Sequence, residues 1–241
     1  MSHTDTPTVI VVNPNTNRET TTMMADLARR HLAPAGLAVE GITVARGPSM
    51  IIDPDALAEA AEHVVDAVRR HLTGPVGDRV VAVIVGAIGD PGRAELAASL
   101  DVPVVGIGQA SILAAAGPGR RFGMATSTPL LVDSLAGLVE GHGKAETFTG
   151  VRLTGSAPLV LARDPERQYS ELAAAARVCA EEDGAEAVII AGGPLSQTAR
   201  RLAELGFVEI VEPLPSASRL VVDVLAKRPG AAGRSAQAQP G

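Results

Sequence analysis

Two uncharged apolar runs dominate the hydrophobic pattern of the chain. Residues 80–85 read Val-Val-Ala-Val-Ile-Val and lead into Gly-Ala-Ile-Gly-Asp-Pro-Gly, while residues 187–191 read Ala-Val-Ile-Ile-Ala and lead into Gly-Gly-Pro-Leu. Such runs predict strands buried on both faces, and the glycines and prolines end them in tight turns. Ligands of open parallel sheets bind beyond the carboxyl ends of the strands. We therefore expect the functional site where these two strand ends face each other.

Shorter apolar runs alternate with helical patterns along the rest of the chain. They predict further strands at residues 8–12, 38–45, 102–107, 121–125, 151–154 and 207–211. Helices are predicted to end near residues 32, 71, 100, 140 and 183, and to span residues 196–205 and 216–226. Helix starts are marked by Thr16 or Asn17 as a cap and by the pairs Asp53-Pro54 and Asp164-Pro165.

The order of these elements repeats, although residue identities in the two parts hardly match. Each part reads as strand, polar loop and helix, twice, then a strand with a glycine turn, a helix and a closing strand. We expect an α/β fold of two similar parallel-sheet halves around a central cleft. The first half is predicted at residues 8–101 plus 213–226 and the second at 102–212. Residues 1–7 and 227–241 are predicted to be a disordered leader and tail.

Composition limits the classes of function. Apolar residues make up 46% of the 241, enough for a packed core, whereas a net charge of −6 and 2% aromatic residues argue against nucleic-acid binding. No apolar run approaches the ~20 residues that span a bilayer, and the first residues lack a signal-peptide pattern. The one cysteine, Cys179, lies at helical spacing with apolar residues and is expected to be inert in the core. We expect a cytoplasmic protein without metal or cofactor.

The polar residues at predicted strand ends are the candidates for ligand contact. Asn13 and Asn15 offer amides to a carbonyl or carboxylate, with bracing of the loop as the equal alternative. Thr126, Ser127 and Thr128 present hydroxyls at a helix start, where anions bind, and Thr126 is also a candidate catalytic group. Ser49 could line the cleft. Asp90 is a turn former or, less favoured, a catalytic acid or base.

The chain also resembles a known family at these loops. Val12-Asn13-Pro14-Asn15-Thr16, Gly89-Asp90-Pro91-Gly92 and Ala125-Thr126-Ser127-Thr128-Pro129 are similar to motifs of the aspartate/glutamate/hydantoin racemase superfamily, most of all its hydantoin and allantoin racemase branch. The likeness covers residues 8–226. It implies a pocket in which Ala87, Ile88, Gly192 and Gly193 join the polar residues named above.

Racemases of that family use two cysteines, one on each side of the substrate's α-carbon, to exchange a proton. The resemblance places these cysteines at Ala87 and Gly192, so both thiols are missing and two-thiol racemisation is not expected. What carries over is a shell of backbone N–H groups and hydroxyls that can hold a carboxylate or enolate.

Three functions stay open. The first is cysteine-independent lyase, decarboxylase, isomerase or ring-forming chemistry beside the carboxylate or imide carbonyl of a small molecule. The second is a racemase that uses other bases, and the third is a non-catalytic binder of small anions. A homo-oligomer is expected in each case.

Overall fold

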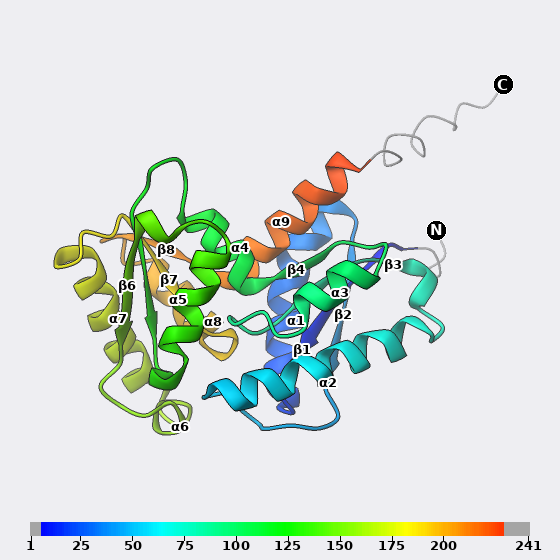
Figure 1. The fold of residues 1–241 in the computed structure, drawn as a ribbon, viewed down its shortest axis with the longest axis horizontal. Helices are drawn as coiled ribbons and strands as arrows, with labels where there is room; N and C mark the ends of the chain where they lie inside the picture. Colours follow the sequence, from blue (N-terminus) through cyan, green and yellow to red (C-terminus); the bar gives the residue numbers. More distant parts are fainter. Residues whose placement is uncertain (1–5, 229–241) are drawn as a thin grey trace.

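The computed structural model describes residues 6–228, and its strands form two four-stranded parallel sheets (Figure 1). The first sheet has the order β2-β1-β3-β4 and the second the order β6-β5-β7-β8. The expected α/β fold with two similar halves is therefore confirmed. The strands are β1 (Thr8–Asn13), β2 (Ala38–Thr43), β3 (Val80–Val85), β4 (Val104–Gly106), β5 (Phe122–Thr126), β6 (Phe148–Leu153), β7 (Ala187–Ile190) and β8 (Glu209–Val211).

Helices cover both sheets. The α-helices are α1 (Arg18–Leu32), α2 (Pro54–Leu72), α3 (Arg93–Ser99), α4 (Ile107–Ala115), α5 (Val132–Gly141), α6 (Pro158–Leu161), α7 (Pro165–Glu181), α8 (Ser196–Ala203) and α9 (Pro213–Lys227). Single 3₁₀ turns are η1 (Ala33–Ala35), η2 (Gly77–Arg79), η3 (Pro129–Leu131), η4 (Ala145–Thr147) and η5 (Gly193–Leu195). No helix in residues 6–228 combines the length and apolar character needed to cross a bilayer.

Three helix starts follow their sequence signals. The side chain of Asn17 accepts hydrogen bonds from the N–H groups of Glu19 and Thr20, so Asn17 rather than Thr16 caps α1. Asp53 caps α2 and Asp164 caps α7, each directly before a proline in the first helical turn. A capped start with proline at the first position satisfies donors that the helix itself leaves free.

The crossing between the halves differs from the expectation. β4 pairs with β3, so it belongs to the first sheet although it lies beyond the expected boundary at residue 101. The chain then enters α4, a helix that the sequence pattern did not predict, before it reaches β5. Residues 107–115 are mostly apolar or small and mostly buried, so they lack the amphipathic period by which helices are recognised.

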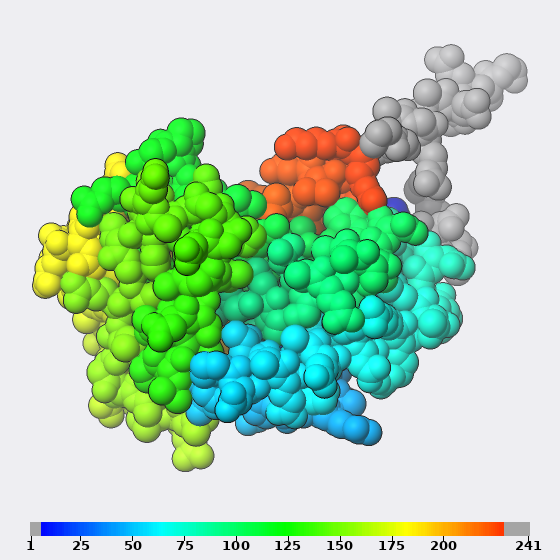
Figure 2. Space-filling model, viewed as in Figure 1, coloured from blue at the N-terminus to red at the C-terminus, as the bar shows by residue number. Residues whose placement is uncertain are grey.

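The chain returns to the first half through α9. This helix begins at Pro213, three residues earlier than expected, and packs against α1 and α4 over the first sheet (Figure 1). Figure 2 shows the face on which the blue-to-cyan start of α2 abuts the green second half. The predicted disorder of residues 1–5 and 229–241 lies outside the described residues, while Lys227 is the last residue of α9.

Candidate active site

The carboxyl ends of β3 and β7 meet between the two halves, as the sequence predicted. A Cβ atom on Gly193 would lie 2.5 Å from the carbonyl oxygen of Gly86. A Cβ on Gly86 would lie 2.8 Å from Cε of Met24 and 3.0 Å from the carbonyl oxygen of Val12. The separations of 2.5 and 2.8 Å are shorter than a Cβ atom tolerates, so glycine at position 193 permits the close approach of the two turns and glycine at position 86 permits the packing of Met24.

A cleft cavity of about 440 Å³ lies over this meeting point and takes residues from both halves. Ala87 and Gly192, the positions that the resemblance assigns to the family's cysteines, both line it. The other predicted residues in its wall are Asn15, Ser49, Ile88, Thr126, Ser127, Thr128 and Gly193. The cavity thus gathers nearly all of the predicted strand-end residues.

Asn13 lies behind the cavity wall and braces its loop. It is fully buried, and its Nδ2 donates to Asn15 Oδ1 at 3.0 Å, to the carbonyl oxygen of Asn17 at 2.8 Å and to Thr21 Oγ1 at 3.0 Å. Its Oδ1 accepts the N–H of Asn15 at 3.2 Å. The amide is therefore occupied within the chain, and of the two predicted asparagines only Asn15 lines the cavity.

Asp90 also lies outside the cavity, where it anchors α4. Its carboxylate accepts the N–H of Gly108 at 2.8 Å and that of Gln109 at 2.6 Å, so it caps a helix that has no capping side chain of its own. Asp90 has a positive φ of 51° and is buried. Burial raises the pKa of Asp90 to about 7, although these two N–H groups favour the charged form. The geometry favours the turn-forming role over the catalytic one.

The hydroxyl loop after β5 lines the opposite side. Thr126 is fully buried, and its Oγ1 donates to the carbonyl oxygen of Ala191 at 2.8 Å and lies 3.1 Å from Thr128 Oγ1. Thr126 thus joins the ends of β5 and β7, and its proton is already engaged. Ser127 has no hydrogen bond from its hydroxyl to any residue in the described range, so this group is open to a ligand.

Several residues that line the cavity, from both halves, have a backbone N–H group without a hydrogen-bond partner. Within residues 6–228, the N–H groups of Ala87, Ile88 and Gly89 make no hydrogen bond, and the same holds for Ser127 and Gly193. The side chain of Ile88 is used differently, because it packs into the apolar core of the second half. Free N–H groups in successive residues form a site for oxyanions.

Among the wall residues that were not singled out from the sequence are Glu19, Gln168, Thr198 and Arg201. The first three lie in the first turns of α1, α7 and α8, where helix starts that follow strand ends were the available signal, and Arg201 lies in the last turn of α8. Glu19 and Arg201 are the only residues with ionisable side chains among those that line the cavity. The guanidinium of Arg201 is held by both carboxylate oxygens of Glu166, at 2.9 and 3.0 Å, and lies over the ring of Tyr169.

Cys179 is remote from this chemistry. It is fully buried in α7, it does not line the cavity, and burial raises its pKa to about 11. A thiol with a raised pKa supplies almost no thiolate at neutral pH.

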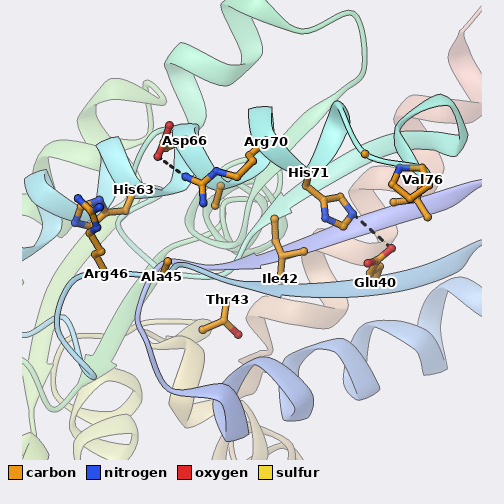
Figure 3. A pocket seen from close by; sticks show the side chains of 13 residues that line it. Glu40, Ile42, Thr43, Ala45, Arg46, His63, Asp66, Arg70, His71 and Val76 are labelled. Atoms are coloured by element: carbon orange, nitrogen blue, oxygen red, sulfur yellow. Dashed lines mark hydrogen bonds and ion pairs between the residues drawn. The ribbon is translucent and has the colours of Figure 1, made fainter.

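A second cavity of about 710 Å³ lies beside the edge strand β2, between it and α2 (Figure 3). Four of its side chains make two contacts with one another, Arg70 with Asp66 at 2.5 Å and Nε2 of His71 with Glu40 at 3.5 Å. It contains none of the strand-end residues, so the smaller cleft cavity is the better candidate for the active site. No cluster of potential metal ligands occurs within residues 6–228.

Known proteins share this fold and this sequence pattern. The hydantoin racemase of Paenarthrobacter aurescens is 26% identical over 218 residues, covering 90% of this chain and 91% of the relative. Allantoin racemase from Pseudomonas fluorescens has a similar structure, with a TM-score of 0.83, 25% identity and 91% of each chain covered. Unliganded arylmalonate decarboxylase shares the fold, with a TM-score of 0.60, 22% identity and coverage of 98% of this chain and 96% of that chain.

The family comparison agrees with the motifs at the strand ends. A model described as Asp/Glu/hydantoin racemase matches residues 9–221, which include every strand residue except Thr8 and all residues that line the cleft cavity. The protein therefore belongs to the Asp/Glu/hydantoin racemase family.

Proposed function

We propose that the protein is an enzyme that binds a small carboxylate or cyclic imide in the cleft and acts on the carbon beside the carbonyl without a cysteine pair. One observation carries this proposal. Ala87 and Gly192, the positions that the resemblance assigns to the family's cysteines, line the same cavity, and the N–H groups of residues 87–89 in its wall make no hydrogen bond within residues 6–228. The cleft can hold negative charge on a carbonyl oxygen, but it offers no thiol to move a proton.

Reactions that form an enolate by breaking a carbon–carbon bond fit this wall best. When a malonate-type diacid loses CO₂, the bonding electrons pass into the remaining carboxylate and form an enolate, so no base is needed. Donors at Ala87, Ile88 and Gly89 would hold the growing negative charge. Water then supplies the proton to the carbon. We therefore place decarboxylase or lyase chemistry ahead of isomerisation and ring formation.

Racemisation through other bases is the less favoured reaction. It needs an acid and a base on opposite faces of one carbon. Among the residues that line the cavity, the ionisable ones are Glu19, which is exposed, and Arg201, which is paired with Glu166. These two do not make a matched pair.

The same scarcity of acid and base groups favours a second candidate, a non-catalytic binder of small anions. The two candidates share the cleft and the donors, and they differ only in whether the ligand is changed.

Incubation in D₂O followed by NMR separates these functions. Methylphenylmalonate-type diacids, hydantoin, allantoin, aspartate and glutamate would be tested in turn with the full-length protein. We expect loss of a carboxyl group and incorporation of deuterium in its place. Binding with recovery of unchanged ligand would favour the binder, and deuterium at an intact α-carbon would favour a racemase.

Two sequence predictions stay predictions. Neither the homo-oligomer nor the cytoplasmic location follows from the coordinates of one chain. Light scattering coupled to size-exclusion chromatography would test the first, and cell fractionation the second.

A further inference from the structure

A hydrogen-bonded side-chain pair forms part of the wall of the cleft on the second half. Thr198, in the first turn of α8, donates its hydroxyl proton to Oε1 of Gln168, in the first turn of α7, at 2.6 Å. Thr198 is only 6% exposed and Gln168 is half-buried, and both line the cavity. Because Oε1 accepts this bond, the amide has its NH₂ group left. That group makes no hydrogen bond within the described residues.

On the first half, Asn15 likewise has an occupied amide oxygen and a free NH₂ group. Oδ1 of Asn15 accepts hydrogen bonds from Asn13 Nδ2 at 3.0 Å and from the N–H of Asn17 at 2.9 Å, whereas its own NH₂ group has no partner in residues 6–228. The NH₂ groups of Asn15 and Gln168 and the free N–H groups of residues 87–89 therefore give the cleft donors from both halves. The amide oxygens of Asn15 and Gln168 already accept hydrogen bonds within the chain.

Such a wall discriminates between ligands by their hydrogen-bonding groups. Carbonyl and carboxylate oxygens satisfy the free donors. An ammonium group needs acceptors, and the one carboxylate in the wall belongs to the exposed Glu19. When a bound ammonium group faces a donor of the wall, neither group finds an acceptor, and both have lost their hydrogen bonds to water. The free-energy cost of such unsatisfied groups is larger inside a cleft than at the surface, where water can still bind them.

We infer that Gln168, oriented by Thr198, is a specificity-determining residue that selects ligands rich in carbonyl or carboxylate oxygens and rejects those with an α-ammonium group. The ligand class is a dicarboxylate or cyclic imide, not an amino acid. This inference rests on the proposed function, since it assumes that the cleft is the binding site.

Calorimetric titration with a matched pair of probes tests the inference. Succinate and L-aspartate share a carbon skeleton and two carboxylates, and they differ by one α-ammonium group. The full-length protein is expected to bind succinate at least about tenfold more tightly than aspartate, the ratio that one lost hydrogen bond gives. Hydantoin is neutral and has two carbonyls. Like succinate, it is expected to bind more tightly than aspartate.

Two substitutions assign the preference to the pair. Gln168→Glu keeps the shape of the side chain but replaces its NH₂ donors by an oxygen. The affinity for succinate should therefore fall about tenfold, and the ratio of succinate affinity to aspartate affinity should become smaller. Thr198→Val removes the hydroxyl that orients the amide and should reduce the preference severalfold, without abolishing hydantoin binding. Circular dichroism and a thermal melt would confirm that each variant is folded.

Gln197→Glu is the matched control. Gln197 also lines the cavity on α8, but it is exposed, and its side chain makes no hydrogen bond with Thr198 or Gln168. It adds the same charge to the same wall, so a smaller loss of succinate binding is expected. An equal loss in Gln168→Glu and Gln197→Glu would overturn the inference, because charge alone would then explain both.

The outcomes also separate this inference from the proposed function. If aspartate binds the unmodified protein as tightly as succinate, the inference fails and the proposed cleft stands. If neither succinate nor hydantoin binds at all, both fail together.

Discussion

Asp90 shows how a residue that looks catalytic in the sequence serves the structure instead. It is the one carboxylate in the central turn, and its pKa is raised to about 7 by burial. Yet both of its oxygens are bonded to the first N–H groups of α4. The residue fixes the turn 86–92, of which residues 86–89 line the cleft cavity, to the helix that joins the halves.

Its raised pKa predicts a pH dependence of stability. An acid whose pKa is higher in the folded than in the unfolded protein stabilises the fold at low pH, and this contribution is lost as the pH rises from about 4 through about 7. The free energy of unfolding of the unmodified protein, minus that of Asp90→Asn, should therefore fall over this range, by up to about 4 kcal/mol. Urea denaturation at a series of pH values measures it. A difference that rises with pH would contradict the assignment.

Gly193 matters because its lack of a side chain allows close contact with the backbone of Gly86. A Cβ there would lie 2.5 Å from the carbonyl oxygen of Gly86, so backbone atoms must move to admit it. Gly193→Ala is expected to lower the free energy of unfolding by about 1–3 kcal/mol, as overpacking does. It should also weaken ligand binding, because the two strand ends would separate.

Gly137→Ala is the control for this substitution. Gly137 lies on the exposed side of α5, and a Cβ there would meet no atom within 4 Å. Since alanine favours helix over glycine by about 1 kcal/mol, this variant should be as stable as the unmodified protein or more so. Thermal melts of both variants compare them directly. Equal stability of the two would show that the close approach of the turns carries no strain.

At the scale of elements, most of the architecture could be predicted from the sequence. Continuous apolar runs marked the two central strands, and Asp-Pro pairs marked the starts of α2 and α7 correctly. α4 could not be predicted because its residues show no amphipathic period and its cap comes from Asp90, 17 residues before its start at Ile107. Because α4 was not recognised, the crossing to the second half was placed before β4 instead of after it.

The site was predictable to the same degree. The predicted strand ends identified the loops that form the cleft. They did not show which residues of each loop line it. Asn13 and Asn15 are alike in the sequence, and only the structure shows that Asn13 turns inward to Asn17 and Thr21. Gln168 and Thr198 come together from separate helices, 30 residues apart, so local patterns gave no sign of the pair.

At the scale of the molecule, the two halves are joined at the point where the ligand is proposed to bind. α4 carries the chain from the first sheet to the second and α9 returns it, while the side chain of Ile88 reaches from the central turn into the second core. The positions assigned to the family's cysteines thus sit on opposite halves of one cavity. Neither Ala87 nor Gly192 carries a side chain that can accept or donate a proton.

Restoring the thiols should therefore restore proton exchange. Gly192 has an extended backbone, with φ of 172°, so a side chain is not excluded by its conformation. The obstacle is the side chain of Leu195, whose Cγ would lie 2.9 Å from a new Cβ and which can rotate away. Ala87→Cys adds only a sulfur atom. The double variant should exchange the α-proton weakly, and neither single variant should racemise.

The most direct test of the central claim is the optical rotation of a single enantiomer of 5-methylhydantoin, followed at neutral pH with the unmodified protein. The spontaneous rate without protein is subtracted, and the Ala87→Cys/Gly192→Cys variant serves as the positive comparison. The account predicts no loss of rotation above the spontaneous rate for the unmodified protein and a measurable loss for the double variant. Rapid loss with the unmodified protein would show that other residues already exchange the proton, and the account based on the missing cysteines would be wrong.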